Sequence, residues 1–396
     1  MMSDKPLLSN LSVLSLEQAT TLPFLTQRLA RDGMRVIRIE APGRGDPNRY
    51  VGRNVLDEEG MNSYFLPNNS GKQAITLNLA EVEGRSILHQ LIDRLRVDIF
   101  ATNNRPSSYQ KLGIDYDTLK SIRPDIIWLG ITGFGPDYDE AAYDPVLQAR
   151  SGWMELTGDL DGLPYVFGLP MVDLGAAEHA YGAVMKALYR RALNGEGSRI
   201  DISMFHSAAQ WMINPLMLTA LGEPVTRRGN THQFFAPVSV YPTRDGFVYI
   251  AVGNDRQWDA LTKLSGFELL ADEKYQRNAG RIAAVAQLND RMTDCTHNMT
   301  TDDLIAALNQ IGVPVAKVNT LNDVLNEPLL HADFARAKDS RTSIEVVLSP
   351  IAEVSADRVS ELSFPPRLGE HNAVIYGEAL GLDQEQIHAL KNRGII

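Results

Sequence analysis

Residues 11–39, LSVLSLEQATTLPFLTQRLARDGMRVIRI, hold the pattern that decides the fold. Leu11 to Leu16 and Arg35 to Ile39 are short, mostly apolar runs, typical of buried strands. Between them, Phe24 to Arg31 has the pattern of a helix, and Gly33 follows as a stop signal. Two strands joined by a helix lie parallel in one sheet, so the chain opens on a βαβ unit.

The same alternation continues along the chain. The sequence predicts a helix, a strand, a short helix and a strand at Glu81 to Leu95, Val97 to Ala101, Tyr116 to Ile122 and Ile126 to Ile131. A long helix ending at Asn194-Gly195 is followed by a strand at Arg199 to Met204 and an apolar helix from near Phe205. We therefore predict an α/β fold with a parallel sheet covered by helices.

The character of the sequence changes after Gly222-Glu223-Pro224. Val238 to Pro242 and Phe247 to Val252 read as paired strands, and helices of mixed charge follow, so we predict a smaller α+β domain. The last helix, near Gln384 to Asn392, is expected to pack back on the first domain. The predicted parts are 1–224 for the first part of the large domain, 225–325 for the small domain and 326–396 for the returning tail.

Composition excludes several classes of protein. With 396 residues and 44% hydrophobic content the chain can bury a large core. Its net charge of -11 argues against nucleic acid or an anionic membrane as the main partner. A single cysteine, Cys295, excludes an internal disulfide, and the eight histidines are far apart, so we predict no metal. Without a signal-like start or a membrane-length apolar run, we expect a cytoplasmic protein.

A basic island lies on the first βαβ unit, between residues 28 and 53, with a local charge of +4. It can bind a phosphorylated ligand at the strand ends, or it can be a solvated face with salt bridges. The nearby glycines match neither the dinucleotide fingerprint nor the phosphate loop. The arginines are Arg28, Arg31, Arg35, Arg38, Arg44, Arg49 and Arg53.

Asp173 is the candidate nucleophile. It stands between a strand-like approach, Tyr165 to Val172, and a helix-like run, Leu174 to Asn194. A helix start is expected to keep a carboxylate ionised through its dipole and free backbone N–H groups, and the ionised form is the nucleophilic one. The alternative is that Asp173 is only an N-cap.

Several short motifs together resemble the class III coenzyme A transferases, the group that contains formyl-CoA and crotonobetainyl-CoA transferases. The motifs run nearly from end to end of the chain. They are Val36–Glu40 with Gly45-Asp46, Asn69–Lys72, Asn103–Pro106, Leu112–Tyr116, Ile131–Gly135, Tyr143-Asp144 with Gln148-Ala149, Ala251–Trp258, Gly312–Ala316 and Pro365–His371.

The resemblance implies a Rossmann-like large domain, a small domain and an interlocked homodimer. It places Asp173 at the family's catalytic aspartate. It implies that Asp173 attacks an acyl-CoA thioester, that a mixed anhydride and then an aspartyl-CoA thioester form, and that a free carboxylic acid accepts the CoA. Backbone N–H groups near Asp173 are expected to stabilise the oxyanion. Coenzyme A enters as substrate and product, with no nucleic acid or membrane partner.

By position in the family, seven residues are expected to bind CoA: Arg38, Lys72, Asn103, Asn104, Arg105, Lys111 and Tyr143. Arg105 and Lys72 can instead serve in structural ion pairs. The chain departs from the family where Thr21-Leu22-Pro23 replaces Ala-Gly-Pro, and where a glycine-rich loop is absent near 230–237. Phe234 and Phe235 are candidates to close the pocket.

Two other functions stay open at the level of sequence. Related acyl-CoA racemases use a histidine and an aspartate for proton exchange, and this chain has Tyr143 where the histidine usually stands. Because tyrosine is a weak acid at neutral pH, that position favours transfer. A non-catalytic acyl-CoA-binding protein is the third possibility, against which the presence of Asp173 speaks.

Overall fold

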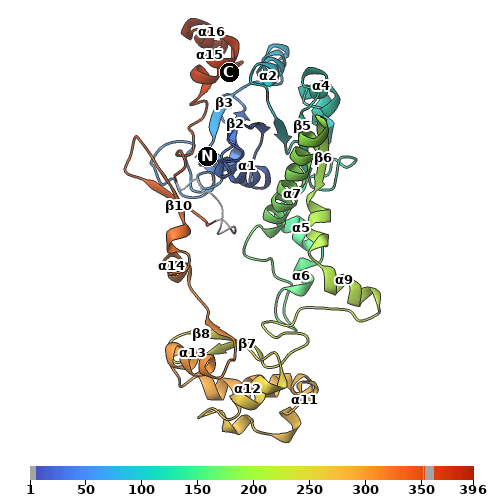
Figure 1. The fold of residues 1–396 in the computed structure, drawn as a ribbon, viewed down its shortest axis with the longest axis vertical. Coiled ribbons are helices and arrows are strands. Elements are labelled where there is room, and N and C mark those ends of the chain that lie inside the picture. Colours follow the sequence, from blue (N-terminus) through green and yellow to red (C-terminus); the bar gives the residue numbers. More distant parts are fainter. Residues whose placement is uncertain (1–5, 351, 353–360) are drawn as a thin grey trace. The chain divides into compact units, whose positions relative to one another are not determined.

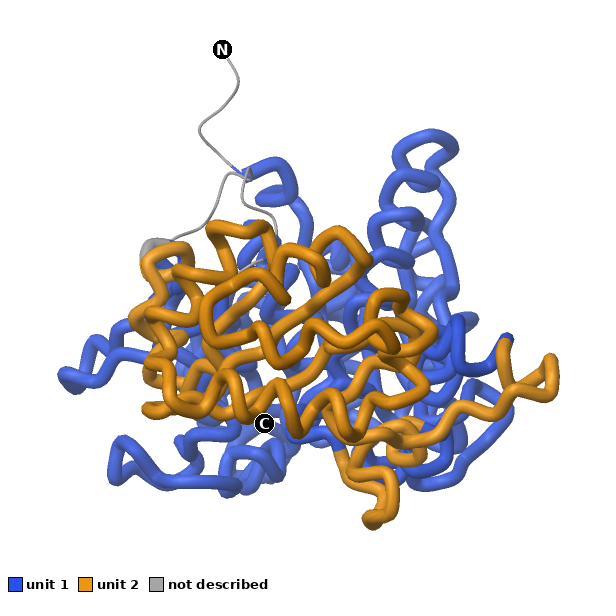
Figure 2. Tube along the Cα trace, turned by 90° about the horizontal axis from the view of Figure 1, so that it is seen from below, with its two compact units in different colours: residues 1–152, 167–217, 332–396 blue, residues 153–166, 218–331 orange. Residues whose placement is uncertain are grey.

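The computed structural model describes residues 6–350, 352 and 361–396. The chain divides into two compact units, coloured separately in Figure 2. The large unit comprises residues 1–152, 167–217 and 332–396, and the small unit comprises 153–166 and 218–331. Compared with the domain limits expected from the sequence, the small unit also takes in the segment 153–166.

The large unit is built on a six-stranded sheet whose neighbouring strands are all parallel, in the order β3-β2-β1-β4-β5-β6 (Figure 1). In the central register, Leu14 of β1 lies beside Ile37 of β2 and Phe100 of β4. The strand order reverses between β1 and β4, and open α/β sheets bind ligands beyond the carboxyl ends of such strands. The strands are β1 Ser12–Leu16, β2 Arg35–Glu40, β3 Gln73–Thr76, β4 Ile99–Thr102, β5 Ile127–Thr132 and β6 Ser198–Ser203.

Helices cover the sheet and supply its core. α2, α4 and α15 pack together, while α1 and α7 pack on each other and on β2, β5 and β6. Trp128 is fully buried, and its indole Nε1 donates to the Ile114 carbonyl at 2.7 Å. Full burial of such a side chain contributes about 2–3 kcal/mol. The helices of the large unit are α1 Thr21–Arg31, η1 Pro47–Tyr50, α2 Val82–Arg94, η2 Pro106–Ser108, α3 Tyr109–Leu112, α4 Tyr116–Ile122, α5 Asp144–Arg150, α7 Met171–Asn194, α8 Met204–Gln210, α15 Asn372–Leu380 and α16 Gln384–Asn392.

The predicted α/β architecture is confirmed, with two local differences. α1 begins at Thr21 rather than Phe24, which brings Thr21 into a helix. The predicted strand-like approach to Asp173 is wrong, because residues 163–170 contain no strand and α7 begins at Met171. Asp173 is therefore inside the first turn of α7, and the N-cap position belongs to Pro170.

The small unit has its own sheet and core. The predicted strand pair forms an antiparallel hairpin, and a third strand extends it. Cys295 is buried there, and burial raises the pKa of its thiol to about 11. Its strands are β7 Val238–Pro242, β8 Phe247–Ala251 and β9 Val315–Lys317, and its helices are α6 Trp153–Leu156, α10 Asp255–Leu261, η3 Glu268–Leu270, η4 Glu273–Tyr275, α11 Asn278–Ala283, α12 Val285–Thr296, α13 Thr301–Gln310 and α14 Leu321–Leu325.

Four further elements complete the secondary structure. α9 Ile213–Ala220 and η5 His331–Asp333 lie at the borders of the units. β10 Ala335–Lys338 and β11 Glu345–Leu348 pair as an antiparallel hairpin within the large unit. None of the helices in the described part of the chain combines the length and apolarity that a membrane crossing requires.

Candidate active site

A cavity of about 210 Å³ opens at the carboxyl ends of β1, β4 and β5, within the large unit. The segments that follow these strands form its wall, together with the loop before α5 and the first turn of α7. This is the reversal point of the strand order, where ligand binding is expected. The lining residues are Gln18, Ala19, Thr21, Asn103, Asn104, Arg105, Pro106, Ile131, Thr132, Gly133, Tyr138, Glu140, Ala141, Ala142, Tyr143, Asp144, Asp173 and Met204.

Asp173 is the half-buried carboxylate of this cavity. The Thr21 hydroxyl donates a hydrogen bond to Oδ1 of Asp173. Burial raises the pKa of Asp173 to about 6; the Thr21 hydrogen bond lowers this pKa, and the Asp144 carboxylate raises it further. The expected lowering of this pKa by the helix start is therefore not seen, although a carboxylate with a pKa of about 6 is still mostly ionised at neutral pH.

Burial is the main cause of the raised pKa, and Asp144, the first residue of α5, adds to it and also occupies the backbone donors of the helix start. Its Oδ2 accepts hydrogen bonds from the backbone N–H groups of Val172 and Asp173, at 2.7 and 3.0 Å. Its Oδ1 accepts from Nε2 of Gln148 at 2.5 Å, and Gln148 Oε1 in turn accepts from the Phe167 N–H at 2.9 Å. Asp144 thus takes the cap donors that would otherwise stabilise the Asp173 carboxylate, and it holds the turn that carries Asp173.

Asp144 and Gln148 are functional residues that the sequence analysis quoted only as part of a motif. Both are nearly fully buried, at 6% and 1% exposed. Their spacing of four residues on one helix could have indicated that they act together, because it puts both side chains on the same face. The sequence gives no indication of their backbone partners in the loop before α7.

Replacing Asp144 by alanine is expected to lower the free energy of unfolding by about 1–2 kcal/mol, because two helix N–H groups lose their acceptor. Turnover is expected to fall as well, since the first turn of α7 loses its anchor. Urea unfolding and steady-state kinetics measure the two effects. Asp137→Ala on the same loop is the control, because Asp137 is exposed and lies outside the cavity lining. Equal effects of both variants would contradict the anchoring role.

Comparison with known proteins bears on this site. The model of the family described as CoA-transferase family III matches residues 8–372. The chain belongs to CoA-transferase family III. This confirms the resemblance that the sequence motifs indicated, and the chain is a family III CoA-transferase homologue.

The relatives of this family III CoA-transferase cover nearly all of it. It is 31% identical to the succinate–glutarate CoA-transferase of Agrobacterium fabrum over 94% of this chain and 96% of the relative. It is 30% identical to the human succinyl-CoA:glutarate CoA-transferase over 99% of this chain and 90% of the relative. A crystal structure of a CAIB/BAIF family protein from Brucella suis superimposes with a TM-score of 0.85 at 34% identity, over 95% of this chain and 100% of that one.

Four of the seven residues expected to bind CoA line the cavity: Asn103, Asn104, Arg105 and Tyr143. The Asn103 side-chain amide makes two hydrogen bonds to the Gln18 backbone: its Nδ2 donates to the carbonyl at 2.8 Å, and its Oδ1 accepts from the N–H at 3.1 Å. Arg105 is exposed, and its guanidinium bonds to no described residue. Tyr143 is 73% exposed. These residues leave polar groups available to a ligand.

Arg38 and Lys72 are placed differently, since both side chains are fully buried and neither lines the cavity. Arg38 pairs with Asp46 at 2.9 Å, and Lys72 pairs with Glu17 at 2.7 Å. Burial lowers the pKa of Lys72 to about 8, and the Glu17 carboxylate opposes that shift. Direct contact of either side chain with CoA is not supported by this arrangement. Lys111 is exposed on α3, outside the cavity lining.

Several arginines of the basic island are paired with carboxylates of the protein, two of them in the interior and two at the surface. Arg49 forms ion pairs with both oxygens of Glu40, at 2.7 and 2.6 Å, and Arg35 pairs with both oxygens of Glu378 at 2.7 Å. Arg28 pairs with Glu178. The salt-bridge interpretation of the island therefore fits these arginines better than a phosphate site.

The buried ion pairs also support the cavity wall. Asp46, the partner of Arg38, accepts a hydrogen bond from the Ala19 N–H at 3.3 Å. Ala19 lines the cavity and has a φ of 63°, a left-handed conformation that a residue with a Cβ adopts only when its surroundings hold it. The charged cluster thus fixes the turn between β1 and α1.

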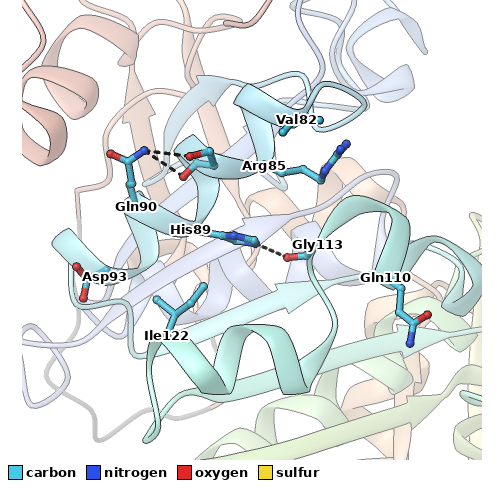
Figure 3. A pocket seen from close by; sticks show the side chains of 9 residues that line it. Val82, Arg85, His89, Gln90, Asp93, Gln110, Gly113 and Ile122 are labelled. Carbon is cyan, nitrogen blue, oxygen red and sulfur yellow. Dashed lines mark hydrogen bonds between the residues drawn. The ribbon is translucent and has the colours of Figure 1, made fainter.

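Another cavity, of about 530 Å³, lies on α2, α3 and α4 and is shown in Figure 3. Several of its polar side chains already have partners: His89 Nε2 lies 2.8 Å from the Gly113 carbonyl oxygen, and Arg85 donates to the Leu79 and Ala80 carbonyls. It contains no arrangement suited to acyl transfer. Among the described residues, no group of three or more potential ligands could hold a metal ion.

Proposed function

We propose that this family III CoA-transferase moves CoA from an acyl-CoA thioester to a free carboxylic acid through covalent intermediates on Asp173. One observation carries the proposal. Asp173 lies in the wall of the cavity with Oδ1 bonded to Thr21, while Oδ2 accepts from no described group. The free oxygen is available for attack, and the bonded one fixes the orientation of the carboxylate.

The proposed reaction balances without a redox partner. Asp173 Oδ2 attacks the acyl carbon, the C–S bond breaks, and CoA leaves as the thiolate with the bonding electrons. The thiolate then attacks Cγ of Asp173, and the acyl group leaves as a free carboxylate. The acceptor carboxylate displaces the thiolate from Cγ, and the thiolate attacks the acceptor's acyl carbon, which regenerates the Asp173 carboxylate.

The raised pKa of Asp173 suits this role. A carboxylate with a pKa of about 6 is a stronger nucleophile than one with an ordinary pKa, yet it is mostly ionised at neutral pH. In the proposed complex, Arg105 faces a CoA phosphate, and Asn103, Asn104 and Tyr143 contact the carrier. The interlocked dimer implied by the sequence motifs stays a prediction.

The acids are proposed to be small dicarboxylic acids. Support comes from the names of the relatives, which include succinate, succinyl-CoA and glutarate. The cavity volume of about 210 Å³ fits a small acid better than a long acyl chain.

The test is mass spectrometry of the protein after exposure to succinyl-CoA or butyryl-CoA, with hydroxylamine as a trap. The proposal expects a hydroxamate confined to Asp173, formed faster from succinyl-CoA. Exchange of the α-proton with solvent deuterium and no adduct would establish racemase chemistry instead. Binding of both thioesters without adduct or exchange would identify a non-catalytic acyl-CoA-binding protein.

The pH dependence of kcat/KM follows from the same residue. Because the ionised carboxylate is the nucleophile and its pKa is about 6, kcat/KM is expected to rise with pH through about 6 and then level. Below that pH the rate should fall about tenfold per unit. Initial rates between pH 5 and 8 measure the midpoint, and unfolding curves over the same range control for loss of folded protein. A midpoint near the ordinary aspartate pKa would contradict the assignment.

A further inference from the structure

The first turn of α7 has no free donor for an oxyanion. The Val172 and Asp173 N–H groups donate to Asp144, the Met171 N–H donates to the Leu169 carbonyl at 2.8 Å, and the Leu174 N–H donates to the Pro170 carbonyl at 3.0 Å. A helix normally leaves the N–H groups of its first three residues unpaired, but those of Met171, Val172 and Asp173 all have acceptors here, and the Leu174 N–H makes the first bond within the helix. The N–H groups in the first turn of α7 are therefore engaged, and the side-chain donor that contacts the Asp173 carboxylate lies on another element.

Thr21 is the polar hydrogen-bond donor that contacts the Asp173 carboxylate from α1. It is 5% exposed and lines the cavity. Its hydroxyl donates to Asp173 Oδ1, and the Met204 sulfur lies 3.9 Å away. The N-terminus of α1, where Thr21 lies, also carries the positive end of the helix dipole.

We propose that Thr21 is a catalytic residue whose hydroxyl stabilises the oxyanion formed when CoA thiolate attacks the Asp173 carbonyl carbon. The inference rests on the proposed function. After Oδ2 has become the bridging oxygen of the mixed anhydride, Oδ1 is the remaining carbonyl oxygen. Addition of the thiolate to Cγ moves an electron pair onto Oδ1. Collapse of that adduct breaks the bond from Cγ to Oδ2 and releases the acyl group as a carboxylate.

The hydrogen bond is thus already in place on the atom where charge develops. A donor held in position in a water-poor site contributes about 10²- to 10³-fold to the rate of such a step. In the resting enzyme, burial raises the pKa of Asp173, and the same hydrogen bond partly offsets that rise. Thr21 therefore acts on the nucleophile before attack and on the oxyanion afterwards.

The experiment compares Thr21→Val with Thr21→Ser. Valine keeps the shape and removes the donor, and serine restores the donor. Succinyl-CoA is mixed with the enzyme without acceptor, and the single-turnover release of succinate reports formation of the aspartyl-CoA thioester. Thr21→Val is expected to slow this release about 10²- to 10³-fold, with KM changed less than about threefold. Thr21→Ser is expected to recover most of the rate, and the pH midpoint should be higher in Thr21→Val than in the wild type.

Thr26→Val is the matched control on the same helix. Thr26 is fully buried and its hydroxyl donates to Glu17 at 2.6 Å, so the change removes a buried donor that lies outside the cavity lining. It is expected to lower stability without moving the pH midpoint. Release of succinate by Thr21→Val at the wild-type rate, with an adduct on Asp173, would overturn the role of Thr21 and leave the proposed function standing. Absence of any adduct in the wild type would overturn both.

Discussion

Asp173→Ala is expected to lower kcat by at least about 10⁴-fold, because the variant has no oxygen to form the covalent intermediates. CoA binding should change little, since the cavity residues Asn103, Asn104 and Arg105 remain. The change is measured as the rate of CoA transfer from succinyl-CoA to glutarate, with the dissociation constant of CoA measured separately. Transfer at a rate within about tenfold of the wild type would exclude Asp173 as the nucleophile.

Asp173→Asn separates catalysis from a structural role. The pKa of Asp173 is raised from 3.8 to about 6, so the folded state binds this proton more tightly than the unfolded state. Its favourable contribution is complete below about pH 4 and is lost as pH rises through about 6. At pH 8 the neutral amide is therefore expected to make the protein more stable by about 2 kcal/mol, and less so at lower pH.

Urea unfolding of Asp173→Asn at pH 8 and at pH 5 measures this difference. If Asp173→Asn is more stable but no longer turns over substrate, the carboxylate serves function and lowers the stability of the folded protein. A loss of stability at pH 8 would indicate that the carboxylate serves mainly to hold α1 against α7 through its hydrogen bond with Thr21.

Arg38→Met is expected to lower the free energy of unfolding by about 3–5 kcal/mol, because it leaves buried carboxylates without their partner. Arg38 is fully buried, lies within 3.8 Å of Glu17, 3.3 Å of Glu40 and 2.9 Å of Asp46, and lies over the Phe65 ring. Removing this cation takes away the ion-pair partner of Asp46 and leaves two buried cations, Lys72 and Arg49, against three buried carboxylates. Urea unfolding at pH 7 measures the effect.

Arg190→Met is the matched control for Arg38→Met. Its ion pair with Glu196 is 61% and 59% exposed, and such pairs contribute at most about 1 kcal/mol. If Arg38→Met is as stable as the wild type but binds CoA more weakly, Arg38 belongs to the CoA site after all. If Arg38→Met is strongly destabilised but its folded fraction keeps the CoA affinity of the wild type, the role of Arg38 is structural.

The sheet was predictable because its strands are short apolar runs separated by helices of regular period. α4 and α16 have the predicted bounds, Tyr116–Ile122 and Gln384–Asn392. β3 was not predicted, because Gln73–Thr76 is short and begins with a polar residue. The approach to Asp173 was mistaken for a strand because its apolar residues are exposed in a loop, and sequence pattern does not report exposure.

The site was predictable only in part. Asp173 and Asn103 to Arg105 were located by motif, and the structure brings them to one cavity. The positive charges of Arg38 and Lys72 suggested that they bind a ligand, because the sequence shows which residues are charged but not which carboxylates they pair with. Their partner Glu17 precedes them by many residues, and only the folded sheet brings the three together. Thr21 was visible as a departure from the family pattern, but its contact with Asp173 depends on the packing of α1 on α7.

The carboxylate of Asp144 has a consequence for inhibitors of the enzyme. Helix N-termini attract inorganic anions such as phosphate and sulfate. At α7 that place is filled by an anion from the protein itself. A dissolved salt therefore finds the Val172 and Asp173 N–H groups beside Asp173 already occupied, and simple inorganic anions are expected to be weak inhibitors.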